Sequence, residues 1–510
     1  MTTDILFIHP SDQKRTYQGL SKEYTAIATP AWTLLLAQYV RKQGFQVAVY
    51  DVNVEGWEPQ VAEELILKYN PRIVIMMVYG HNPSASTQTM PAARKIAIDI
   101  KFYNKNIPIG LGGIHPSALP ERTLREEAVD FVIKGEGADT IIGLVKHLQG
   151  FGNIRDIKGL WFWKNGKIDS NPPANVVNDL DNEFDGYAWD LLPDLNNYRA
   201  HNMHCFQDFH KSLKDDFSDI RSPYVAMNTS LGCPFSCHYC CINAIFGKPK
   251  IRYWSLGKAM SWIDELVLKY KVRNIRLDDE LFILSPERIE RFCDLIIERR
   301  YDLNLWVYGR VDTIKETLLP KIKKAGINWI CLGIEAGNER VRSAVNKNIR
   351  CDIKEVVKSL QSHDISVLGN YMFGLPEDNI DTMQETLDLA MDLNCEFANF
   401  YSVMAYPGSR LYEDAIAKKM SVPDRWECFS QLSEETTPLS TNYISGAEVL
   451  RFRDEAFYKY YNNPSYLKMV EKKFGSCVRK HIEKMLNLKI ERKLLKDEVL
   501  LKGGNECQKS

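Results

Sequence analysis

The sequence lacks several features that would assign it to common classes of protein. No apolar run approaches the roughly 20 residues of a membrane-spanning helix, and residues 1–10 lack the basic and apolar regions of a signal peptide. The 65 lysine and arginine residues are balanced by 66 aspartate and glutamate residues, so no surplus of positive charge indicates nucleic acid as a partner. We therefore expect a cytoplasmic protein with no membrane span and no bound nucleic acid.

Internal repeats and low-complexity tracts are also lacking, and the hydrophobic fraction of 45% is that of an ordinary globular chain. With 510 residues, the chain is too long for one hydrophobic core, which predicts two to four domains. In a reducing compartment its 12 cysteines are expected to be thiols or metal ligands rather than disulfides.

Residues 1–150 alternate between strand and helix patterns. A short apolar run at 4–10 precedes a helical pattern at 29–44, and the same order recurs up to residue 148. The run PRIVIMMVYG at 71–80 is continuously apolar, as in strands buried on both faces. This alternation predicts a doubly wound parallel sheet of the Rossmann or flavodoxin type, which binds ligands at the carboxyl ends of its strands.

The remaining chain divides into three parts. Residues 151–221 contain a hairpin with Asn165-Gly166 at its turn and then a Pro-, Asp- and Asn-rich stretch, which we interpret as a linker. Residues 222–430 contain about six strand–helix units in one direction, which predicts a partial (β/α)6 barrel of the TIM type. Residues 431–510 predict a small helical C-terminal domain, which we expect to cap the barrel mouth.

Three cysteines lie close together in the loop after the first strand of the predicted barrel: Cys233, Cys237 and Cys240. Thiolates suit iron–sulfur clusters or zinc, but structural zinc usually takes four ligands in two pairs, and no second cysteine pair follows here. Three thiolates on a four-iron cluster leave one iron open for a substrate or cofactor. We expect Cys241 to point away, and a zinc site that includes His238 remains an alternative.

With this loop in this position, residues 222–415 resemble the radical S-adenosylmethionine (SAM) superfamily. The resemblance implies that SAM binds the open iron of a [4Fe–4S] cluster through its amino and carboxylate groups. It places Tyr239 near the adenine, Asp279 and Glu280 near the amino group, and Arg310 near the carboxylate. It also places Glu335 near the ribose or amino group, and Gly374 on a glycine-containing strand beside the adenine.

The first domain lacks the GxGxxG motif of dinucleotide-binding proteins. Its glycine turns, LGGIHPS at 111–117 and GEG at 135–137, resemble instead the cobalamin-binding domain that is fused to many radical SAM enzymes. Glycine lets the backbone approach a cofactor closely. The resemblance implies that the following residues contact the cobalamin tail: Asn82, Ser84, Gly112, Gly113, Ser117, Gly135, Glu136 and Gly137.

The loop at 11–30 lacks the histidine that many cobalamin domains place below cobalt. We expect cobalamin with its own base displaced and no histidine below the metal. His9, Tyr79 and His81 lie at predicted strand ends and are further candidates for the lower face, although each could equally be an ordinary polar residue.

The resemblance implies a cobalamin-dependent radical SAM enzyme, most commonly a methyltransferase that acts on an unactivated carbon through a 5′-deoxyadenosyl radical and methylcobalamin. Radical cyclisation, oxidation or ring rearrangement without methyl transfer is an alternative, and a non-catalytic cobalamin or iron–sulfur sensor is another. We expect a small-molecule substrate between the two domains and an external one-electron reductant of the flavodoxin or ferredoxin type.

Overall fold

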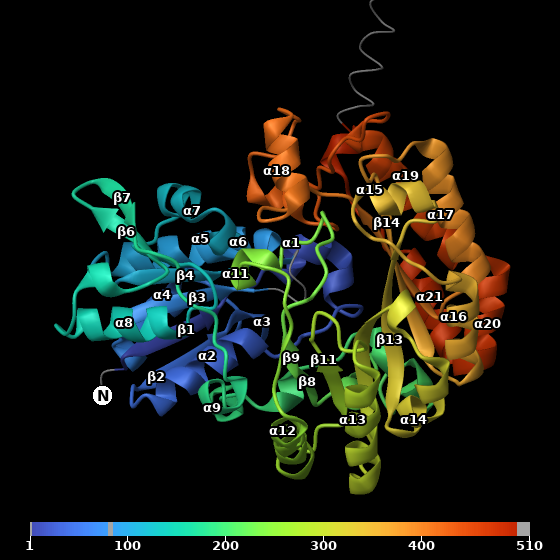
Figure 1. Ribbon diagram of the computed structural model, residues 1–510, viewed down its shortest axis with the longest axis horizontal. Coiled ribbons are helices and arrows are strands. Elements are labelled where there is room, and N and C mark those ends of the chain that lie inside the picture. The colour runs from blue at the N-terminus through green and yellow to red at the C-terminus, as the bar shows by residue number, and fades with distance from the viewer. Residues whose placement is uncertain (1–2, 80–84, 497–510) are drawn as a thin grey trace, which may run out of the picture.

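Two parallel sheets form the framework of the computed structural model, which describes residues 3–79 and 85–496 (Figure 1). The first sheet has the strand order β2-β1-β3-β4-β5-β6-β7, and the second has the order β15-β14-β13-β12-β11-β8. A two-stranded ribbon of β9 (Ser230–Leu231) and β10 (Arg252–Tyr253) lies within the second unit, between β8 and β11 in the sequence.

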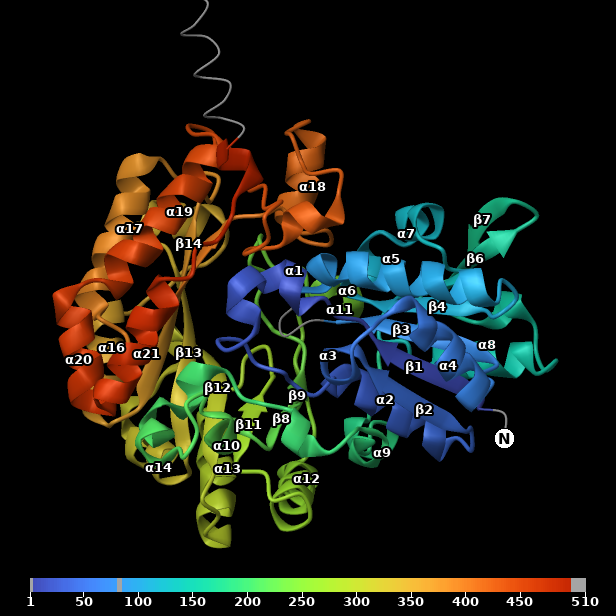
Figure 2. The ribbon, with the colours of Figure 1, turned by 180° about the vertical axis from the view of Figure 1, so that it is seen from behind.

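The first sheet is doubly wound, as the sequence predicts. Its five parallel strands are β1 (Ile5–His9), β2 (Val47–Asp51), β3 (Ile73–Val78), β4 (Ile109–Gly113) and β5 (Phe131–Ile133). Helices α2 (Ala31–Lys42) and α8 (Ala138–Leu148) contact each other, as do α4 (Pro59–Tyr69) and α5 (Ala85–Tyr103) (Figures 1 and 2). Because helices cover both faces, every residue of β3 is buried, which explains its unbroken apolar sequence.

The hairpin predicted within the linker extends this first sheet. Strand β6 (Leu160–Lys164) pairs antiparallel with β5, and β7 (Lys167–Ser170) forms the edge. The rest of the linker contains short helical turns, among them α9 (Leu180–Glu183), η5 (Asn202–Lys211) and α10 (Ser218–Arg221). The first structural unit therefore reaches beyond residue 150.

The second sheet curls into a half barrel whose six strands are all parallel. They are β8 (Tyr224–Met227), β11 (Asn274–Leu277), β12 (Asn304–Arg310), β13 (Ile327–Glu335), β14 (Ser366–Phe373) and β15 (Phe397–Ser402). The helices between them include α12 (Leu256–Leu268), α13 (Pro286–Arg299), α14 (Leu319–Lys324), α16 (Ile353–Ser362) and α17 (Ile380–Leu393). Local sequence sets their ends: Ser285 caps the start of α13 and Pro286 occupies its first position.

Helices α19 (Gly446–Tyr461), α20 (Pro464–Phe474) and α21 (Ser476–Leu486) form the helical C-terminal region (Figure 1), in which α19 contacts β15. In the described residues, no helix is long and apolar enough to cross a membrane.

Candidate active site between the two sheets

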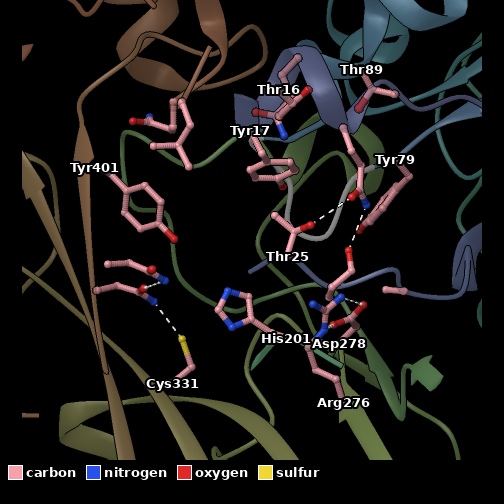
Figure 3. Close-up of a pocket in the computed structure, with 18 of the residues that line it drawn as sticks. Thr16, Tyr17, Thr25, Tyr79, Thr89, His201, Arg276, Asp278, Cys331 and Tyr401 are labelled. Atoms are coloured by element: carbon pink, nitrogen blue, oxygen red, sulfur yellow. Dashed lines mark hydrogen bonds and ion pairs between the residues drawn. The ribbon is translucent and has the colours of Figure 1, made fainter. Parts of the chain in front are cut away.

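A cavity of about 570 Å³ joins the carboxyl edge of the first sheet to the lumen of the half barrel (Figure 3). From the first sheet, its lining includes His9 at the end of β1 and Tyr79 after β3. From the second sheet, β11 to β15 each contribute residues, and Asn228 contributes from the position after β8. Phe457 of α19 and Met485 of α21 also line it. Both sheets therefore present their carboxyl ends to one space, where parallel α/β sheets bind ligands.

The loop after β1 closes the open side of the half barrel. Thr29 donates a hydrogen bond from its hydroxyl to the carbonyl of Ala226 (3.1 Å) and accepts one from the amide of the same residue (2.9 Å), which pairs it with edge strand β8. The buried guanidinium of Arg221 donates to the carbonyls of Glu23, Thr25 and Ala200 at 2.7–2.8 Å. This loop forms a wall of the cavity.

The three cysteines lie in the loop between β9 and α11 (Asn243–Phe246). All three are partly exposed thiols without a disulfide, and Cys233 and Cys240 line the cavity. Burial, together with neighbouring charges that include Cys237, raises the pKa of Cys233 to about 11 and that of Cys240 to about 12. Cys241 is buried and does not line the cavity, consistent with its expected orientation.

The donor set fits a cluster better than a single ion. Within residues 3–79 and 85–496, no group of three or more His, Cys, Asp or Glu side chains is placed to hold one metal ion. Ligands of one zinc ion must converge at about 2.0–2.3 Å from it, whereas thiolates of a [4Fe–4S] cluster bind different irons and stay farther apart. The described residues contain no such group around His238.

Arg310 supports the cysteine loop. Its guanidinium lies 4.0 Å from the ring centre of Phe235, between Cys233 and Cys237 in the sequence. It also pairs with Asp312 (3.0 and 3.1 Å) and donates to the carbonyl of Asn348 (2.7 Å). Because Arg310 is engaged in this way and does not line the cavity, the role beside the SAM carboxylate remains only a prediction.

The two residues of the predicted acidic pair at the end of β11 have different roles. Asp279 is 1% exposed and accepts hydrogen bonds from the amide and hydroxyl of Thr229 and from the hydroxyl of Ser230, so it fixes the turn before the cysteine loop. Glu280 accepts from the amide of Gly232 (3.0 Å) and from the hydroxyl of Tyr79 (3.2 Å). Burial raises the pKa of Glu280 to about 7.

Glu335 ends β13 at a register shift with a φ of +66°, a conformation that side chains other than glycine rarely adopt. Its Oε1 accepts hydrogen bonds from the hydroxyl of Tyr239 (2.9 Å) and from Nζ of Lys347 (3.0 Å). Glu335 and Tyr239 both line the cavity, as expected for a nucleotide site. The sequence analysis missed Lys347, a buried lysine that no local pattern distinguishes.

Gly374 follows β14 with a φ of +90° and backs onto α19. A Cβ atom there would lie 2.6 Å from a methyl carbon of Val449. The neighbouring Met372 lines the cavity, whereas Gly374 does not. The requirement for glycine therefore has a packing explanation.

The cavity wall at the first sheet fits a cofactor with many polar side groups. Two lining residues each have a buried ring nitrogen, Nδ1 of His9 and Nε1 of Trp32, without a hydrogen-bond partner among the described residues. Burial lowers the pKa of His9 to about 4, so the ring is neutral near pH 7. Cobalamin carries amide groups around its ring, which could satisfy such donors and acceptors.

The predicted cobalamin residues of the glycine turns lie outside the lining of this cavity. Gly113 adopts a φ of +126° with its Cα against the carbonyl of Val78, and the hydroxyl of Ser117 accepts from the amide of Gly135 (3.0 Å). Glu136 forms a buried ion pair with Arg252 of β10 and accepts from the amide of Val177 (2.5 Å). Its carboxylate therefore joins the two structural units. Asn82, Ser84 and His81 lie outside the described residues.

Together, a doubly wound domain and a half barrel whose three-cysteine loop brings two thiols to the same cavity fit an iron–sulfur protein with a second cofactor-binding domain. Comparison with protein families identifies both parts: residues 18–145 match the B12 binding domain, and residues 227–390 match the radical SAM superfamily. The chain belongs to the cobalamin-binding radical SAM proteins.

Relatives and solved structures agree with this assignment. The chain is 26% identical to an uncharacterized methyltransferase of Pyrococcus horikoshii, over 93% of this chain and 96% of the relative. It is 24% identical to the anaerobic magnesium-protoporphyrin IX monomethyl ester cyclase of Rubrivivax gelatinosus, over 91% of this chain and 78% of the relative. The radical SAM methyltransferase TsrM of Kitasatospora setae, solved with cobalamin and a [4Fe–4S] cluster, has a TM-score of 0.67 at 15% identity, covering 91% of this chain and 90% of TsrM.

Proposed function

We propose that this protein is a cobalamin-dependent radical SAM methyltransferase that acts on an unactivated carbon. The observation that carries the proposal is the single cavity shared by the thiols of the cysteine loop and the carboxyl edge of the B12-binding domain. When bound, the cluster supplies the electron that cleaves SAM, and cobalamin supplies a carrier for the methyl group.

The chain's own residues bind and orient the reactants. Cys233, Cys237 and Cys240 would hold three irons, and Glu280 and Glu335 offer carboxylate oxygens to the ammonium and ribose of SAM. Lys347 keeps the carboxylate of Glu335 in place through a buried ion pair. The loop after β1 covers the edge strand β8 of the half barrel, and a covered site protects a reactive radical from solvent.

A radical cyclase is the second candidate, because the cyclase of Rubrivivax gelatinosus matches nearly the whole chain. In either case the substrate would lie between the two domains, and a one-electron donor of the flavodoxin or ferredoxin type would deliver electrons. A cytoplasmic location is part of the same proposal.

The products of SAM distinguish the candidates. The reconstituted protein would be incubated anaerobically with SAM, cobalamin, a low-potential reductant and a candidate substrate, and the products would be analysed by mass spectrometry. Methyl transfer predicts S-adenosylhomocysteine and 5′-deoxyadenosine in equal amounts, together with a methylated product. Deoxyadenosine without S-adenosylhomocysteine indicates the cyclase type of reaction, and neither product from a fully loaded sample contradicts both.

A further inference from the structure

The lower part of the cavity, inside the half barrel, carries the features of a substrate site. It lies farther from the carboxyl ends of the strands than Glu335. Trp306 and Tyr308 of β12, Asn370 of β14 and Asn399 of β15 line it. Tyr17 from the loop after β1 and Tyr401 of β15 lie opposite each other across this space in Figure 3. The walls are therefore largely aromatic, which favours a substrate with a ring system.

The cations that line this part of the cavity are already paired with carboxylates of the protein. Among the described lysine and arginine side chains, only Arg276 and Arg453 line the cavity. Arg276 forms a buried ion pair with Asp278 and lies over the ring of Trp306. A carboxylate or phosphate that approached Arg276 would have to compete with the carboxylate of Asp278, which also lines the cavity.

The second arginine is engaged in the same way. Arg453 donates to the carbonyl of Phe400 (2.7 Å) and to Asp454 (2.8 Å). The cavity lining also contains the carboxylates of Asp12, Asp279, Glu280 and Glu335, so its charge disfavours a further anion.

The polar groups of the lumen wall are uncharged and form a ladder across three strands. Asn399 donates from Nδ2 to Oδ1 of Asn370 (3.1 Å), and Asn370 donates from Nδ2 to Sγ of Cys331 (2.9 Å). Asn370 and Asn399 are direct partners in the register of β14 and β15, so both side chains lie on the lumen face. Cys331 and Tyr401 lie on the same side of the cavity in Figure 3.

The ladder leaves hydrogen-bonding capacity toward the cavity. An asparagine side chain has two donors and one carbonyl acceptor, and Oδ1 of Asn399 receives no hydrogen bond from the described residues. The hydroxyls of Tyr308 and Tyr401 likewise have no hydrogen-bond partner in the described part of the chain, although both residues are only partly buried. A neighbouring indole N–H, Nε1 of Trp306, is buried without a partner as well.

From these observations we infer that the substrate is an uncharged ring-containing molecule that presents an amide-like pair of donor and acceptor groups to Asn370 and Asn399. This inference rests on the proposed function, which places the reacting carbon in the lumen. Carboxylated and phosphorylated molecules are disfavoured because the lumen arginines are already paired. An amide is favoured because it can donate a hydrogen bond to an asparagine oxygen and accept one from an asparagine N–H.

Three probes with the same ring system test the inference: naphthalene-2-carboxamide, naphthalene-2-carboxylate and naphthalen-2-ylmethylamine. Equilibrium dialysis against the reconstituted protein with cobalamin and SAM measures each dissociation constant at pH 7.5. We expect the carboxamide to bind at least tenfold more tightly than the other two. Equal or tighter binding of the carboxylate or the amine, or binding of none of the three, overturns the inference.

Two variants locate the binding site. Asn399→Asp should weaken carboxamide binding at least fivefold, and Tyr401→Phe, which removes one hydroxyl, should weaken it about threefold. Asn106→Asp, the same change on an exposed side chain outside the cavity, should leave binding unchanged. Unchanged carboxamide binding in both lumen variants, with circular dichroism like that of the parent protein, would place the probe elsewhere and contradict the inference.

The same samples separate this inference from the proposed function. Deoxyadenosine formed in the absence of any probe reports SAM cleavage, whereas dialysis reports the preference of the lumen. SAM cleavage with a preference for the carboxylate rejects the substrate class alone. A preference for the carboxamide without SAM cleavage supports the substrate class and counts against the proposed function.

Discussion

At the scale of single residues, Arg310 supports the cysteine loop through its contact with Phe235, and its bonds to Asp312 and Asn348 hold the guanidinium in place. Lysine keeps the charge but has no planar face and no paired donors. We expect Arg310→Lys to lower the iron content per chain after anaerobic reconstitution by half or more, while the secondary structure is retained.

The control for this substitution is Arg291→Lys. Arg291 forms an exposed ion pair with Glu298 at 3.5 Å, so its replacement should leave the iron content unchanged. Full iron content in Arg310→Lys would show that the loop does not depend on Arg310.

Some residues of the site could be predicted from the sequence and others could not. The three thiols and the carboxylates at strand ends could be predicted because they lie at fixed positions in short motifs. Their partners could not be predicted, because they are distant in the sequence. Lys347 lies 12 positions from Glu335, and Arg252 lies 116 positions from Glu136. Tyr79 lies 201 positions from Glu280. For this reason, the structural roles of Asp279, Arg310 and Glu136 were not foreseen.

At the scale of elements, the loop after β1 is the part that sequence patterns did not describe. Strands and helices were predicted because their apolar residues repeat with periods of two and 3.6. This loop has neither period, and its conformation depends on bonds to Arg221 and to the edge of β8. The wall of the half barrel therefore became visible only in three dimensions.

We expect Arg221→Met to destabilise this loop. The substitution leaves the carbonyls of Glu23, Thr25 and Ala200 without their donor, and hydrogen bonds to charged groups contribute about 1.5–3 kcal/mol each. The free energy of unfolding in urea should fall by about 3 kcal/mol or more, and amide exchange in residues 13–29 should accelerate.

Arg125→Met provides the comparison, because Arg125 forms an exposed ion pair with Glu121 within one helix. That variant should lie within about 0.5 kcal/mol of the parent protein. Unaltered exchange in residues 13–29 of Arg221→Met would contradict the assignment of Arg221 as the support of the wall.

At the scale of the whole molecule, the ion pair between Glu136 and Arg252 connects the first sheet to the ribbon after the cysteine loop. Removing one partner of a buried pair typically costs about 3–5 kcal/mol, because the remaining charge stays buried. We expect Glu136→Gln to lower the unfolding free energy by this amount and to leave cobalamin affinity within twofold of the parent value.

The double variant Glu136→Met with Arg252→Met should recover much of the lost stability, since it leaves no unpaired charge. A tenfold loss of cobalamin affinity in Glu136→Gln with unchanged stability would instead support the cofactor contact that the glycine turn suggests.

A second connection at this scale is His481, where α21 meets η5 and the loop after β1. Burial lowers the pKa of His481 from 6.5 to about 3, so the unfolded chain takes up a proton below pH 6.5 that the folded chain does not. Stability from this residue is therefore lost as the pH falls. Between pH 7.5 and 5.0 the loss is about 2 kcal/mol, from about 1.36 kcal/mol for each pH unit below 6.5.

Urea unfolding at these two pH values measures the effect. In His481→Gln the change in unfolding free energy with pH should be smaller than in the parent protein by about 2 kcal/mol. His210→Gln, the same change on an exposed side chain of η5, should keep the parent slope. An identical slope in all three proteins would show that His481 is not buried in its neutral form.

The central claim is that three thiols of one loop hold a cluster that cleaves SAM in the cavity between the two domains. Its most direct measurement is 5′-deoxyadenosine formed per chain by the anaerobically reconstituted protein and by four single cysteine-to-alanine variants. We expect Cys233→Ala, Cys237→Ala and Cys240→Ala to lose more than 99% of the nucleoside, and Cys241→Ala to form it at a rate within twofold of the parent. Nucleoside formation at the parent rate by any of the first three variants, or none by a parent protein with four irons bound, would contradict the account.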